Sequence, residues 1–157
     1  MLAITGYSVV LSIHVMAVVL AFGVTFAYPI IGPFIGKNHP GSLRAIHEMQ
    51  ERIGKLLITP AATLALATGI YMASDHDLFD RVWVQVPMGI LIVLLGLGGA
   101  FFSPQERKAA ALAPGEGQAP TPEYLAVVGR VAKVGMLASL LILVAIFLMI
   151  TKPGGYA

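Results

Sequence analysis

Hydrophobic residues fall into four long runs along the chain, and short polar segments separate them. The first charged residue is Lys37, and the uncharged segment before it exceeds the roughly 20 apolar residues that a membrane-spanning helix needs. The four runs cover residues 5–31, 56–74, 82–103 and 130–150. This pattern predicts an all-α fold, a membrane four-helix bundle that forms a single transmembrane domain over residues 1–157.

The polar segment before the second run predicts an extension of that helix beyond the membrane. Within residues 43–55, Arg44 and Glu48 lie four positions apart, as do Glu51 and Lys55, so opposite charges share one helical face. We therefore expect these residues to form a helix that continues without interruption into the second span.

Proline and capping residues predict the other helix ends. Thr121 followed by Pro122 is a typical helix start, so the fourth helix should begin well before its apolar run. Residues 104–121 are rich in Pro, Gly, Ala and charged residues and predict a flexible loop. Pro29 and Pro33 should end or bend the first helix. Helices two and four are thus expected to extend beyond the bilayer on the side of this loop.

Small residues along the second span predict close helix packing. Ala61, Ala65, Gly69 and Ala73 recur every four residues, and small residues at this spacing let helix backbones approach one another in lipid. Pro60 falls inside the same helix and should bend it.

Composition supports the membrane assignment and adds an orientation. The chain is 57% hydrophobic and 11% charged, with a net charge of +2, whereas soluble domains carry about 25% charged residues. The lipid bilayer is therefore the expected partner, and the small net charge does not suggest nucleic acid. Eight of the ten Lys and Arg residues lie in or beside the first and third connections. By the positive-inside rule, we expect a bacterial cytoplasmic membrane protein with both termini outside and loop 104–121 in the cytoplasm.

The sequence contains no cysteine, which excludes disulfides, thiolate metal sites and cysteine nucleophiles. We find no glycine-rich phosphate loop and no zinc motif. These observations give no catalytic residues and favour a non-enzymatic protein.

His14 is the one ionisable residue deep inside a predicted span. Such residues are uncommon, usually face the bundle interior and often mark a functional site. Ala17, Ala21 and Thr25 lie on the same helical stripe, and their small side chains would leave room beside the imidazole. Three interpretations are open: a neutral histidine hydrogen-bonded across the bundle, a ligand of haem iron or another metal, and a proton or ion relay.

A second histidine, His76, lies between Asp75 and Asp77 at the far end of the second span. A carboxylate–histidine–metal arrangement is one interpretation, and a solvated turn is the interpretation that we favour. Because His76 should lie about 8–10 Å further out than His14 by helical rise, we do not expect both to bind one haem.

Charged residues near the loop side of the membrane predict a structural clamp between helices two and four. The predicted ion pairs join acidic and basic groups at similar depth: Glu48, Glu51, Arg52, Arg130 and Lys133. Partly buried pairs of this kind are more often structural than ligand-binding.

Three segments carry a family resemblance. They are IHVMAVVLAFGVTFAYP (Ile13–Pro29), MQERIGKLLITPAATLALATGIYM (Met49–Met72) and FLMITKPGG (Phe147–Gly155). They resemble a bacterial family of predicted four-helix integral membrane proteins of unknown function, over most of the chain except residues 105–121.

The chain is more distantly similar to the J-type protoporphyrinogen oxidase and to the copper-resistance D membrane domain. The oxidase pattern is matched by His14 with Pro29 and by Glu51-Arg52 before the Thr59–Ala61 segment. This resemblance implies that His14 binds haem. The chain departs from the oxidase where helix three, beginning at Val82, lacks the expected histidine and lysine, and where helix four lacks an Asn-Glu pair.

Taken together, these patterns predict a non-enzymatic multi-pass membrane protein that serves as a scaffold or as an accessory subunit of a membrane complex. The alternative is a membrane redox protein that binds haem b through His14. A homo-oligomer and a larger membrane complex are both open as its state of assembly.

Overall fold

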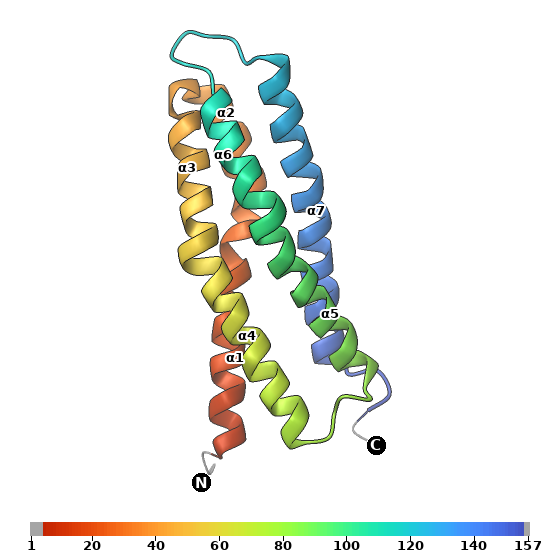
Figure 1. The fold of residues 1–157 in the computed structure, drawn as a ribbon. Helices are drawn as coiled ribbons and strands as arrows, with labels where there is room; N and C mark the ends of the chain where they lie inside the picture. The colour runs from red at the N-terminus through yellow and green to blue at the C-terminus, as the bar shows by residue number, and fades with distance from the viewer. Residues whose placement is uncertain (1–4, 156–157) are drawn as a thin grey trace.

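The computed structural model describes residues 5–155, and its regular elements are all helices (Figure 1). They form four long helices. The first consists of α1 (Gly6–Phe22), a 3₁₀ segment (Gly23–Ala27) and α2 (Tyr28–Asn38). The second begins with a short 3₁₀ turn (Pro40–Ser42) and continues through α3 (Leu43–Ile53), a π-helical segment (Gly54–Ile58) and α4 (Thr59–Asp75). The third consists of α5 (Val82–Leu97), a π-helical segment (Gly98–Phe102) and α6 (Ser103–Leu112), and the fourth is α7 (Pro122–Thr151). The predicted all-α bundle is confirmed.

The four helices are long and apolar enough to cross a membrane, and they contain 33, 36, 31 and 30 residues. At 1.5 Å per residue, each is about 45–54 Å long, whereas the hydrocarbon core of a bilayer is about 30 Å thick. All four therefore project beyond the hydrocarbon, although the sequence predicted long extensions only for helices two and four.

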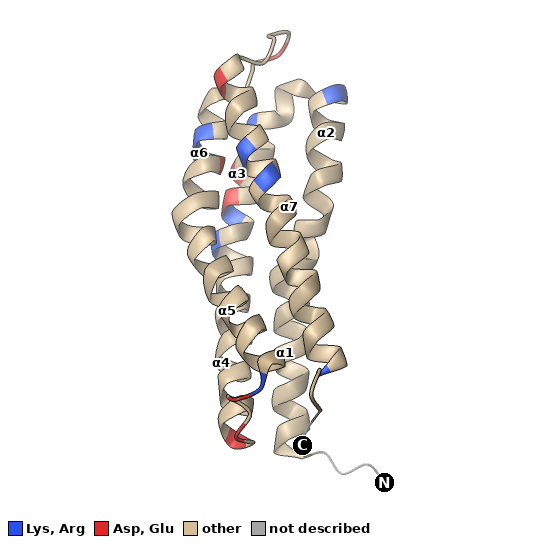
Figure 2. Cartoon of the chain, turned by 90° about the vertical axis from the view of Figure 1, so that its right-hand side faces the viewer, with Lys and Arg blue, Asp and Glu red and all other residues tan. Residues whose placement is uncertain are grey.

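The two ends of the bundle differ in charge (Figure 2). At one end, which we call the terminal end, α1 begins and α7 ends (Figure 1). Most Lys and Arg residues lie toward the opposite end, which contains residues 37–55 and 103–133 and which we call the basic end. The exceptions are Arg81, directly before α5, and Lys152, directly after α7, and both positions belong to the terminal end.

Two π-helical segments let the second and third helices continue through a proline. Proline lacks an N–H and disturbs the preceding turn of an α-helix. The N–H of Thr59, directly before Pro60, donates to the carbonyl of Gly54, and the N–H of Ser103, directly before Pro104, donates to that of Gly98. These five-residue hydrogen bonds accommodate the proline without ending the helix.

The predicted loop at residues 104–121 is therefore wrong in its first half. Residues 103–112 form α6, which ends at Leu112, and only Ala113 to Thr121 connect it to α7. Apart from Pro104, the residues of α6 are mostly strong helix formers, QERKAAAL after the proline. The first helix is also longer than predicted, because it continues past residue 31 and Pro33 to Asn38. The predicted start of the fourth helix is confirmed, and the Thr121 hydroxyl accepts a hydrogen bond from the N–H of Tyr124.

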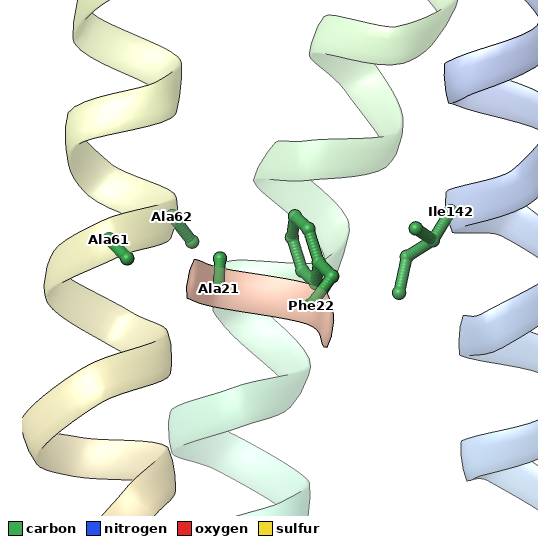
Figure 3. Packing of buried hydrophobic residues seen from close by; sticks show 5 residues of the cluster. All are labelled: Ala21, Phe22, Ala61, Ala62 and Ile142. Atoms are coloured by element: carbon green, nitrogen blue, oxygen red, sulfur yellow. The ribbon is translucent and has the colours of Figure 1, made fainter. Parts of the chain in front are cut away.

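Small residues hold α1 against α4 (Figure 3). Ala21 and Ala65 are 0% exposed, and Ala21 belongs to one apolar cluster with Ala62, Phe22 and Ile142 of α7. The predicted packing role of the α4 alanines is confirmed. A second cluster joins α3, α6 and α7 at the basic end, and we call it the basic-end core. Its buried members are Leu43, Ala109, Tyr124 and Val127.

Candidate functional site

The side chain of His14 points from α1 toward α4. Its Nδ1 atom lies 2.8 Å from the carbonyl oxygen of Ala65 and 3.0 Å from the hydroxyl oxygen of Thr68. His14 therefore forms a hydrogen bond across the bundle, as the first of the three interpretations expects. The small Ala65 is fully buried and lets α1 approach the α4 backbone closely enough for this contact.

These partners determine which ring nitrogen of His14 carries the proton. A carbonyl oxygen can only accept, so Nδ1 must donate to Ala65. The Thr68 hydroxyl donates to the carbonyl of Leu64 at 2.8 Å, so it too accepts from Nδ1. In the neutral imidazole, Nε2 then keeps its lone pair, and the described residues supply no hydrogen-bond donor to it.

His14 lines a cavity of about 350 Å³ between the α1/α4 pair and the α5/α7 pair. The two pairs separate toward the terminal end in Figure 1. Apart from His14 the walls are apolar, and two methionines, Met88 of α5 and Met149 of α7, contribute to them. Val19 and Ile150, which also line the cavity, are 63% and 75% exposed. The cavity is thus open to the lipid-facing surface, and its volume is in the range of small-molecule sites.

The residues predicted to share a cofactor-binding face with His14 do not line this cavity. Ala17 and Ala21 are 1% and 0% exposed and pack toward α4. The Thr25 hydroxyl donates to the carbonyl of Phe22 at 2.7 Å. Small residues on this stripe bring a neighbouring helix closer instead of leaving space beside the imidazole. Room beside His14 arises on another face of α1, at Val15 and Val18.

Gly69 belongs to the site, although the sequence suggested only a packing role for it. A Cβ atom at this position would lie 3.3 Å from Cε1 of His14. Such a contact is tighter than ordinary van der Waals packing, so any larger residue pushes against the imidazole. Glycine therefore fixes the space in which the His14 ring lies.

His76 lies at the end of α4, seven residues beyond Gly69, or about 10 Å by helical rise. Its Nε2 is 3.6 Å from Asp75 Oδ2, and its ring meets Tyr7 edge-on at 4.7 Å between centroids. His76 is thus not part of the His14 cavity. Within residues 5–155, no three histidine or acidic side chains converge on a position for a metal ion.

A buried polar network at the basic end was not predicted. His47 Nδ1 lies 2.6 Å from Glu106 Oε2, and His47 Nε2 lies 3.0 Å from the Tyr124 hydroxyl. The three residues come from α3, α6 and α7 and are 8%, 7% and 4% exposed. One feature of the sequence indicates that His47 is buried. Leu43 lies one helical turn before His47, and the two residues share the buried face of α3.

The charged residues of the predicted clamp have other partners. Glu48 pairs with Arg44 at 2.9 Å. Glu51 pairs with Lys55, lies 3.5 Å from Arg107 Nε and accepts a hydrogen bond from Ser103 at 3.1 Å.

These contacts correct the predicted clamp between helices two and four. Among the described residues, Arg52, Arg130 and Lys133 form no ion pair. Glu51 therefore connects the second long helix to the third, because α6 continues the third helix beside α3 where a loop was expected.

Comparison with known proteins identifies the family. No curated protein and no solved structure matches the chain. A family described as predicted integral membrane proteins, DUF2269, matches residues 8–153. Four apolar helices of spanning length agree with that description. The chain therefore belongs to this family of predicted integral membrane proteins, whose function is unknown.

Proposed function

We propose that this protein is a membrane-embedded haem b-binding protein that holds the haem iron through Nε2 of His14. The observation that carries the proposal is the orientation of the ring. Histidines that bind a metal usually donate their other N–H to a carbonyl or carboxylate, which fixes the tautomer. The hydrogen bond from His14 Nδ1 to Ala65 does this and leaves Nε2 available as a ligand.

The chemistry of the cavity beside His14 supports haem as the bound group. The cavity beside His14 is apolar and opens to lipid, so a flat hydrophobic ring system can enter from the bilayer. Met88 and Met149 line the same cavity, and the thioether of either residue would be able to serve as a further ligand of haem iron. When bound, haem would supply one-electron redox chemistry. The residues of this chain would hold the haem, keep the His14 imidazole oriented and exclude water from the cavity.

A purely structural role explains this geometry less completely. A neutral histidine that served only to join α1 and α4 would leave the Nε2 lone pair without a donor at an apolar cavity, and an unpaired polar group in such a place is costly. A metal ion bound to the Nε2 lone pair would remove this cost.

We place the protein in a bacterial cytoplasmic membrane, with both termini outside. The support is the distribution of Lys and Arg, because eight of ten lie toward the basic end and basic residues favour the cytoplasmic side.

Titration of the purified protein with haemin in detergent tests the haem proposal. The wild type and the variant His39→Ala, which removes an exposed histidine, should bind haemin with a saturable Soret shift. His14→Gly should lose this binding and regain a ligated spectrum when free imidazole is added. Binding by His14→Gly that equals the wild type, or no binding by the wild type, would overturn the proposal and return the protein to a scaffold role.

A further inference from the structure

A second pocket lies at the basic end between α3 and α6 and has a volume of about 280 Å³. Ala110 and Ala111 form one wall, and their small side chains leave the hollow open. The charged groups that line it are Arg44, Glu48, Glu51, Arg52 and Arg107. The pocket is therefore polar, unlike the cavity beside His14.

The carboxylates of this pocket are already paired, whereas one arginine is not. Glu48 is bound by Arg44 at 2.9 Å, and Glu51 is held by Lys55, Arg107 and Ser103. The guanidinium of Arg52 forms no hydrogen bond or ion pair with any residue in the range 5–155. With Lys55 at its edge, the pocket has an excess of positive charge and one guanidinium available for an anion.

The pocket lies where the polar and apolar surfaces of the second long helix meet. Leu56 follows Arg52 by four residues, or about 6 Å along the helix, and its side chain is 78% exposed. An apolar side chain exposed to this degree in a membrane protein faces lipid chains. We therefore expect the guanidinium of Arg52 to lie at the depth of the lipid headgroups.

We propose that this pocket binds the phosphate of an anionic lipid headgroup. Arginine forms two parallel hydrogen bonds to phosphate oxygens, and basic pockets between helices at the membrane surface favour acidic lipids. A free phosphate compound shares this chemistry, but only a lipid also covers the exposed apolar surface at Leu56. The proposal does not depend on haem binding at His14.

Native mass spectrometry of the detergent-solubilised protein measures the binding directly. Phosphatidylglycerol should bind more tightly than phosphatidylcholine with the same acyl chains. Arg52→Gln should weaken phosphatidylglycerol binding about fivefold, the effect expected for one basic group near the surface. Arg130→Gln, which removes an exposed arginine outside the pocket, is the matched control and should leave the affinity unchanged. Glu48→Gln removes a competing carboxylate and should strengthen binding.

Three results would overturn the proposal. The first is equal binding of phosphatidylglycerol and phosphatidylcholine. The second is an equal loss in Arg52→Gln and Arg130→Gln, which would indicate a diffuse charge effect without a pocket. The third is Arg52-dependent binding of glycerol phosphate at the same concentration as the lipid, which would make the ligand a soluble phosphate.

Discussion

Replacement of Glu106 by leucine should destabilise the protein strongly, because it leaves His47 without its partner. The two side chains are 7% and 8% exposed, and the atoms that meet, Glu106 Oε2 and His47 Nδ1, are 2.6 Å apart. Water cannot replace the lost acceptor at such a buried site. Leaving a buried hydrogen-bond donor without its partner costs about 1–3 kcal/mol.

The expected change in melting temperature follows from the size of the protein. For a chain of this length, 1 kcal/mol corresponds to roughly 2–4 °C, so Glu106→Leu should lower the melting temperature by about 2–12 °C. Thermal unfolding in detergent, followed by far-ultraviolet circular dichroism, measures this shift. The matched control is Glu123→Leu, because Glu123 pairs with Lys108 at 2.9 Å but is 60% exposed. Exposed pairs contribute about 0–1 kcal/mol, so the control should lose little.

The double variant His47→Leu, Glu106→Leu separates the interaction energy between the two side chains from the packing energy of each one. Replacing both groups by apolar side chains removes the unpaired donor, so the double variant should be more stable than the sum of the single losses by about 1.5–3 kcal/mol. Strict additivity, or a loss in Glu106→Leu no larger than in the control, would refute the role assigned to this network.

Three other substitutions test other parts of the structure. Val127→Ala in the basic-end core removes two buried methyl groups and should cost about 2 kcal/mol, or roughly 4–8 °C in melting temperature. A melting temperature within about 1 °C of the wild type would contradict this packing. Glu51→Gln breaks the ion pairs to Lys55 and Arg107 and should lower the melting temperature more at low salt than at high salt; a loss that does not change with salt would exclude the ionic explanation. Gly69→Ala pushes on His14, whose Cε1 would lie 3.3 Å from the new Cβ, and should weaken haemin binding in the titration above more than Gly96→Ala, where a Cβ meets no atom within 4 Å.

The four spans were predictable from sequence because the bilayer imposes a length on each apolar run. The continuation of helix three through Pro104 was not predictable from local rules, since a proline usually ends a helix or bends it. Pro60 and Pro104 each follow a glycine by six residues, as GKLLITP and GGAFFSP. In both places a π-helical segment shifts the hydrogen bonds so that the helix continues.

The candidate site was predictable only in part. His14 stands out because an ionisable side chain in lipid requires a partner, but its partners Ala65 and Thr68 depend on how α1 and α4 are rotated and offset. The sequence does not specify that offset. His47 was missed as a buried residue because the charges around it, such as Glu48, are typical of a solvent-exposed helix.

The absorbance spectrum of the protein purified from haem-replete cells, recorded oxidised and dithionite-reduced, tests the central claim most directly. We expect a Soret band and a reduced α-band in the wild type and in His39→Ala, and neither band in His14→Ala. A colourless wild-type protein would contradict the claim, as would bands of full intensity in His14→Ala.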